Sequence, residues 1–242
     1  MTLERLSELI REEARRGEIP VDRQAYEQLG KDPGEPILCA GALDAPVAIL
    51  GRDLGKDEVR FGQPLIGAGG KLVRQGILRA WNHPDSTEPL TRGKLEHALR
   101  HALLTNTVPF KPPGNKAYAD PVKERFRPYL LRLLTQFWSG HHIITLGTEA
   151  FRWFEPYGCQ DEFRGRGRTE RRFTSAFPCR LPVPGSDPNP LASKAVKVLP
   201  LPHPSPLNRR WHAQFTSMLA QRLLEIRPDV NAGSHDGIAR AH

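Results

Sequence analysis

The chain contains 242 residues, which corresponds to one large domain or two small ones and is enough to bury a sizeable core. Lysine and arginine number 35 against 27 acidic residues, so the formal net charge is +8, a value typical of proteins that bind a polyanion. The 38% of hydrophobic residues excludes a disordered chain, and no apolar run approaches the ~18 residues of a transmembrane helix. The first residues lack the apolar stretch of a secretory signal, so we expect a cytoplasmic protein without membrane attachment.

The three cysteines, Cys39, Cys159 and Cys179, are odd in number and far apart in the sequence. They form no CxxC pair, and we expect neither a disulfide framework nor a four-cysteine metal site. This usage fits a reducing cytosol.

Leucines at helical spacing predict an amphipathic helix over residues 3–16, which Gly17 and Pro20 end. Short continuous apolar runs, each typical of a strand buried on both faces, follow at 46–51, 102–106, 142–147 and 196–201. Helical patterns separate and follow them at 71–79, 121–137, 148–154 and 209–226. Strands that alternate with helices predict an α/β fold, a three-layer αβα sandwich with a central, mostly parallel four-stranded sheet.

We therefore expect a single domain over residues 1–226, with the N-terminal helix at 3–16 and the core at 46–226. Residues 227–242 have the composition of a disordered tail. The basic segment Arg164–Arg172 is flanked by aromatic residues and is either a DNA-facing patch or a solvated loop. A segment rich in Pro, Gly, Asp and Asn at 182–193 predicts a surface loop.

Polar residues suited to catalysis or to ligand binding follow three of the predicted strands. Asp53 comes after the first strand, Asn106 ends the second and His203 follows the fourth. In an open parallel sheet, ligands bind outside the carboxyl ends of the strands, so these side chains are expected at one edge. Taken singly, each has an ordinary structural explanation: an aspartate cap, a backbone-bonded amide and a turn histidine.

These residues carry a resemblance to the uracil-DNA glycosylase superfamily over residues 46–224. The segments 51–58 and 62–70 are similar to the "GEAPGxxE…GRPFVGxAG" start of its fourth, thermophile-type family, and 105–115 is similar to that family's "TNVVKCRPPGN". Residues 127–130 and 143–147 match its "RPYL" and "VALG". His203–Leu207 is instead similar to the "HPSPL" loop of the first family, and Gly51-Arg-Asp53 resembles that family's "GQD".

Two departures from the fourth family matter for the chemistry. That family holds an iron–sulfur cluster on four cysteines, but two of these positions are Phe110 and Phe126 here, and the N-terminal pair is missing. We therefore expect no cluster, no metal and no redox cofactor. The aromatic residue that stacks on uracil is Leu65 here, which weakens the expected base stacking.

The resemblance implies a role for each remaining residue. Asp53 is the expected catalytic carboxylate, which stabilises positive charge on the sugar, and His203 the expected donor to O2 of the departing uracil. Asn106 matches the O4 and N3–H edge of uracil. Glu58, which also competes with Asp53 for the catalytic role, is expected beside C5 of the base. Gly51 and Leu65 complete the predicted uracil pocket.

A second group of residues is expected to contact DNA. Leu207 ends a proline-stiffened loop and is expected to wedge into the base stack, with a core leucine as the alternative. Arg209 and Arg210 would then face phosphates, with Ser205, Gly69 and Gly70 nearby.

The resulting prediction is a monomeric repair glycosylase that flips uracil out of DNA and hydrolyses its N-glycosidic bond. A catalytically weak or inactive protein of the same fold that binds damaged DNA is the alternative, since Leu65 replaces the stacking aromatic. A glycosylase for another deaminated base is a further possibility. The sequence does not distinguish single-stranded from double-stranded DNA as the preferred substrate.

Overall fold

The computed structural model describes residues 1–81, 91–159, 170–185 and 192–233. Six strands form one sheet in the order β1-β3-β2-β4-β6-β5. The four inner strands are β3 (Ala102–Asn106), β2 (Val47–Gly51), β4 (His142–Leu146) and β6 (Ser193–Leu201), and they pair in parallel. These are the four strands expected from the apolar runs, so the predicted fold class is confirmed.

Two short antiparallel strands extend the sheet beyond the expected four. β1 (Cys39–Ala40) pairs with β3, and β5 (Phe177–Pro182) pairs with β6. β1 is too short to give a hydrophobic pattern. β5 begins inside an irregular region and contains Pro178, a residue that sheets tolerate at an edge strand.

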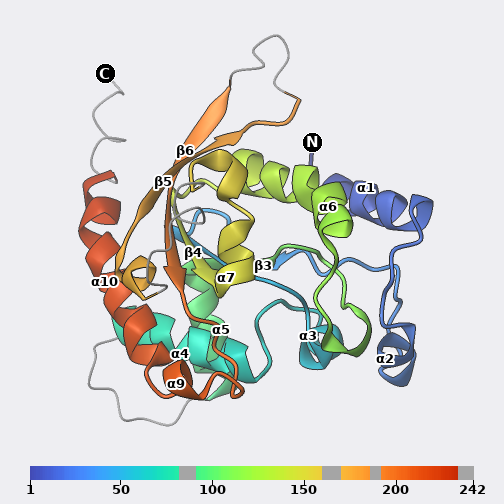
Figure 1. The fold of residues 1–242 in the computed structure, drawn as a ribbon, viewed down its shortest axis with the longest axis horizontal. Helices are drawn as coiled ribbons and strands as arrows, with labels where there is room; N and C mark the ends of the chain where they lie inside the picture. Colours follow the sequence, from blue (N-terminus) through green and yellow to red (C-terminus); the bar gives the residue numbers. More distant parts are fainter. Residues whose placement is uncertain (82–90, 160–169, 186–191, 234–242) are drawn as a thin grey trace.

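Helices cover both faces of the sheet (Figure 1). Their apolar residues pack with alternating residues of the strands. Val47 and Ile49 of β2 pack with α4 (Ala68–Trp81) and α10 (Phe215–Gly233). Ala48 and Leu50 face the opposite way, toward α1 (Leu3–Arg16), α6 (Asp120–Arg132) and α7 (Thr148–Arg152). The period of two along each strand thus builds two separate cores, which completes the three layers.

The remaining elements are short and connect these layers. They are α2 (Arg23–Gln28), α3 (Lys56–Phe61), α5 (Arg92–His97) and α9 (Arg209–His212), with 3-10 turns at Ala98–Arg100, Pro113–Asn115, Glu155–Tyr157 and Arg171–Thr174 and a π-helical turn at Leu133–Phe137. The predicted C-terminal helix is therefore two helices, α9 and α10. α10 continues past Ile226 to Gly233, so residues 227–233 of the expected tail are helical, and 234–242 lie outside the described residues. Among the described helices, none is both long and apolar enough to cross a bilayer.

Cysteines that are far apart in the sequence meet in the fold. The Sγ atoms of Cys159 and Cys179 lie 3.1 Å apart and both side chains are buried, whereas Cys39 lies on β1. The pair is reduced in this structure. These two cysteines, 20 residues apart in the sequence, meet because β5 carries Cys179 back to the turn that contains Cys159.

Candidate functional site

A cavity of about 410 Å³ lies where β2 and β3 end and the β6–α9 loop begins. The register pairs Gly51 with Asn106 at the ends of β2 and β3, which places the loops that follow both strands side by side. Nine of the residues predicted for the site line this cavity: Gly51, Asp53, Glu58, Leu65, Gly69, Gly70, Asn106, His203 and Ser205. The carboxyl ends of the parallel strands thus bring together side chains from three distant parts of the chain.

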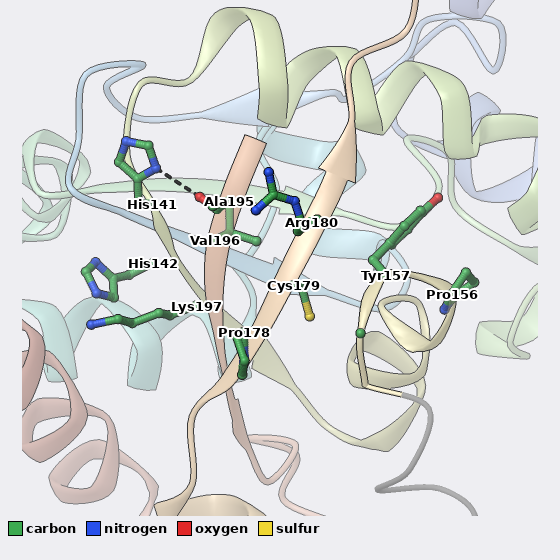
Figure 2. Close-up of a pocket in the computed structure, with 11 residues that line it drawn as sticks. His141, His142, Pro156, Tyr157, Pro178, Cys179, Arg180, Ala195, Val196 and Lys197 are labelled. Carbon is green, nitrogen blue, oxygen red and sulfur yellow. Dashed lines mark hydrogen bonds between the residues drawn. The ribbon is translucent and has the colours of Figure 1, made fainter. Parts of the chain in front are cut away.

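A larger cavity of about 1020 Å³ opens at the other end of the sheet (Figure 2). It is lined by His142, the first residue of β4, and by Lys197, its partner on β6. The His141 ring is hydrogen-bonded through Nδ1 to the carbonyl of Ala195 at 3.0 Å, and a dashed line marks this bond in Figure 2. It contains none of the predicted site residues. Since ligands of open α/β sheets bind at the carboxyl ends of the strands, we assign the functional site to the smaller cavity.

The Asp53 carboxylate is buried at this cavity, with a side chain only 5% exposed. Helix α3 has Gly55 as its N-cap, so Asp53 is not the helix cap that its position after a strand also allowed. Oδ2 accepts a hydrogen bond from Nε of Arg52, whereas Oδ1 has no hydrogen-bond partner in the described chain. Burial raises the pKa of Asp53, and Arg52 opposes this shift. Oδ1 of this buried carboxylate thus makes no regular hydrogen bond in the described chain, while the backbone N–H of Tyr118 acts on the carboxylate and lowers its pKa by a smaller amount.

Asn106 ends β3 with its side chain inside the cavity wall and is 4% exposed. Its Oδ1 has no hydrogen-bond partner in the described chain, which is costly for a buried amide oxygen. A Cβ on Gly51 would lie 2.6 Å from Asn106 Nδ2 and 3.0 Å from a methyl group of Leu65. Only glycine at position 51 therefore leaves room for the amide and the leucine to share this corner.

His203 follows β6 and is accessible from the cavity mouth. Partial burial and, next, the charge of Arg52 lower the pKa of His203, which favours the neutral imidazole. Gly147 follows β4 with φ of 87°, and a Cβ there would lie 3.1 Å from His203 Cβ. Gly147, which the sequence did not single out, therefore permits the close approach of the imidazole.

Glu58 lines the cavity, but its carboxylate is already occupied. Oε1 accepts from the backbone N–H groups of Ile66 and Gly67, at 3.2 and 3.0 Å, and Oε2 accepts from that of Gly55 at 2.9 Å. The two bonds to Oε1 tie the glycine-rich loop, residues 62–70, to α3, and the bond to Oε2 caps α3 at its own N-terminus. Of the two carboxylates predicted for the site, Asp53 is the one with an unpartnered oxygen.

The loop that carries Leu65 is strained and tightly packed. Leu65 has φ of 52°, an unusual conformation for a residue with a side chain. A Cβ on Gly70 would lie 2.0 Å from the Leu65 carbonyl, and one on Gly69 would lie 3.1 Å from the carbonyl of Pro204. The predicted glycines thus serve close packing of this loop against α4 and against the loop after β6.

Arg74 supports the same loop from inside the protein and was not predicted. It is 1% exposed and donates to the Leu65 carbonyl at 3.3 Å, the Leu95 carbonyl at 3.4 Å and Gln63 Oε1 at 3.2 Å. The available signal was a charged residue next to Val73 on the apolar face of the helix. A buried guanidinium with several acceptors holds a strained loop in place.

Three of the residues predicted to contact DNA, Leu207, Arg209 and Arg210, lie outside the cavity, whereas Gly69, Gly70 and Ser205 line it. Leu207 is 93% exposed, on a turn in which its own N–H donates to Ser205 Oγ at 3.2 Å, so the core alternative for this leucine is wrong. Arg209 is exposed, and Arg210 forms an ion pair with Glu170 at 2.5 Å. In the basic segment 164–172, residues 164–169 lie outside the described residues.

The last arginine of that segment, Arg172, points inward. It is 8% exposed and donates to Thr148 Oγ1 at 2.8 Å. Arg172 therefore takes no part in a DNA-facing patch.

The residues at the positions of the iron–sulfur cysteines do not fit a cluster. Phe110 and Phe126 are buried in the same core, with ring centroids 5.7 Å apart. Phenyl rings cannot ligate iron, and they fill the space with apolar contacts. No group of three or more potential metal-ligating side chains occurs among the described residues.

We propose that the chain works without an iron–sulfur cluster and expect a colourless protein when it is purified without air. The measurement is the visible absorption spectrum together with iron and sulfide analysis. Visible thiolate-to-iron absorption with stoichiometric iron would contradict the proposal.

Arg74→Leu is expected to lower the free energy of unfolding by about 2 to 4 kcal/mol, because it leaves buried oxygen acceptors without a donor. Urea unfolding followed by circular dichroism measures the change. Arg79→Leu is the matched control, since Arg79 is an exposed arginine of the same helix whose guanidinium contacts Ser217 Oγ. Equal effects of the two substitutions would show that Arg74 has no special supporting role.

The comparison with known families agrees with the geometry of the cavity. Residues 40–227 match the family model described as the uracil DNA glycosylase superfamily. A search of curated proteins finds no match to the chain. The matched range contains the whole sheet except the first residue of β1, and all the residues that line the cavity. The chain therefore belongs to the uracil-DNA glycosylase superfamily.

Proposed function

We propose that this protein flips uracil out of DNA and hydrolyses the bond between uracil N1 and the sugar C1′, leaving an abasic site. One observation carries the proposal: Asp53, Asn106 and His203 line one cavity, and the first two each present a buried oxygen that no described residue bonds. Buried polar atoms without partners are rare in proteins, and the two at this cavity are placed where a ligand or water can bond them. Membership of the superfamily supports the reaction class.

In the proposed reaction, opposite charges develop on the base and on the sugar as the bond breaks. The bonding electron pair leaves with uracil, while positive charge grows on the sugar ring. The Asp53 carboxylate stabilises the sugar cation and orients a water molecule, whose oxygen then bonds C1′ while one of its protons passes to the carboxylate. The neutral His203 imidazole donates a hydrogen bond to O2 of the departing anion.

Asn106 supplies recognition of the base in this proposal. Its Oδ1 accepts from uracil N3–H and its amide nitrogen donates to O4, a pairing that cytosine reverses. Glu58 keeps the glycine-rich loop in place, as its two hydrogen bonds to the backbone of that loop indicate. The enzyme acts on one nucleotide, so we further propose that it works as a monomer in the cytoplasm.

The composition of the cavity favours a second candidate function, the binding of damaged DNA without hydrolysis. None of the described residues that line the cavity is Phe, Tyr or Trp, and Leu65 occupies the position of the stacking aromatic. Leucine gives a flipped base less stacking energy than an aromatic ring. Incubation with a uracil-containing oligonucleotide separates the candidates, because only hydrolysis leaves an alkali-labile strand. Selective binding without cleavage would support the second.

Asp53→Ala is expected to lower kcat by about tenfold to a thousandfold, the range for one preorganised electrostatic group. DNA affinity, measured by fluorescence anisotropy, is expected to survive because phosphate contacts supply most of it. Glu58→Ala is the comparison: we expect it to lower the melting temperature as well, since it frees three backbone N–H groups. If Asp53→Ala kept nearly wild-type activity while Glu58→Ala folded stably but was inactive, the roles of the two carboxylates would be reversed.

Leu207→Ala is expected to reduce activity more on paired uracil than on uracil in a single strand. In a duplex the exposed leucine fills the gap left by the flipped nucleotide, which offsets an opening cost of a few kcal/mol. Single-turnover rates on both substrates measure the difference. Leu224→Ala, an exposed leucine on α10, serves as control. Equal losses on both substrates would argue against the wedge.

A further inference from the structure

Arg52 is a charged residue of the cavity to which neither the resemblance nor the sequence assigned a role. It follows Gly51 at the end of β2, and its side chain lines the cavity. Its Nε donates to Asp53 Oδ2, and the arginine side chain is 34% exposed against 5% for the aspartate. The buried carboxylate thus has a cation bonded to one oxygen, and that cation remains accessible.

The backbone of Arg52 is held without help from its side chain. The carbonyl of Arg52 accepts from the N–H of Thr107 at 3.2 Å and from its hydroxyl at 2.6 Å. Thr107 is 1% exposed and follows directly after β3. A change of the Arg52 side chain therefore leaves the loop anchored, so its effect on the charges of the site can be measured separately.

The electrostatics connect Arg52 with both groups proposed to act on the substrate. Burial raises the pKa of Asp53, and Arg52 opposes this with its charge and its hydrogen bond. The backbone N–H of Tyr118 and the ammonium of Lys123, on α6, lower the pKa of Asp53 by smaller amounts. For His203, Arg52 adds to burial in lowering the pKa. Lys56, Asp57 and Glu58 of α3 are the other charged residues that line the cavity.

We propose that Arg52 is a positioning residue of the hydrolysis, which binds Oδ2 of the Asp53 carboxylate at the cavity and acts on the reaction through that carboxylate. This inference rests on the proposed function, because it assigns Arg52 a task within that reaction. The Arg52 guanidinium stabilises the Asp53 carboxylate, which is proposed to face the sugar. Its charge also lowers the pKa of His203, which is proposed to face the base. An exposed arginine that contacted only a DNA phosphate would not stabilise the Asp53 carboxylate and would not lower the pKa of His203.

The sign of the pH dependence follows from these contacts. Without the cation, Asp53 takes up a proton at higher pH than before, and so does His203. Both changes remove the reactive forms on the acid side of the profile. Arg52→Gln is therefore expected to move the acid limb of kcat to higher pH, with a loss on the order of tenfold at acid pH that shrinks toward the alkaline plateau.

The test uses glutamine because its amide can still donate to Asp53 while the charge is gone. The titration of Asp53 is followed by NMR on protein labelled with carbon-13 at the aspartate carboxyl groups, with Asp53→Asn to assign the signal. His203 is followed through its ring carbon. We expect both groups in Arg52→Gln to titrate at higher pH than in the wild type, and Arg52→Lys to return them toward it.

Arg16→Gln is the matched control, since it removes the same charge from a side chain on α1 that is 74% exposed. It should leave both titrations and the acid limb unchanged. Identical titrations of Asp53 in the wild type and in Arg52→Gln would overturn the inference, as would an equal shift in Arg16→Gln. The NMR measurement needs no substrate, so it tests Arg52 even if the wild type releases no uracil, a result that would instead refute the proposed function.

Discussion

The parallel pairing of β2 with β3 on one side and β4 on the other determines where this protein can act. Parallel strands point their carboxyl ends toward one edge, so the loops that follow them meet there. Because Gly51 pairs with Asn106, β2 and β3 end side by side and the two loops leave the sheet at neighbouring positions. The glycine also leaves the space that the amide fills. A shift of this register by one residue would turn Asn106 toward the other face of the sheet.

The polar groups around the cavity are of two kinds: some hold the loops in place, and others keep an oxygen that no described residue bonds. Glu58 and Arg74 spend their hydrogen bonds on backbone and side-chain atoms of the glycine-rich loop, and so hold its shape. Asp53 and Asn106 each leave one buried oxygen without a described partner. Each such atom costs about 1 to 3 kcal/mol of stability. The folded chain tolerates this cost at the place where a substrate would supply the missing partners.

The sequence predicted the inner sheet and most of the cavity, because apolar runs and the residues after them are local signals. It missed what depends on distant contacts. β5 contains prolines, and its place at the edge of the sheet depends on its pairing with β6, a contact that the local sequence does not show. The support by Arg74 depends on acceptors contributed by the loop before its helix and by α5. Glu58 was assigned to the base, and only the fold shows that three backbone groups occupy its oxygens. Cys159 and Cys179 meet for the same reason.

The strand order also has a consequence for how the protein assembles. β2 lies between two strands that are made later, and β4 must wait for β6, which is the last strand of the chain. Asp53 is synthesised early and His203 late, so no partly made chain contains the complete cavity. Pairing strands that are far apart in the sequence closes long loops, and the entropy cost of closure comes before the stabilising contacts form. Sheets dominated by such pairings therefore fold slowly. A ribosome-bound chain therefore lacks one strand of the inner sheet until β6 has emerged, and incomplete sheets of this kind leave a strand edge unpaired.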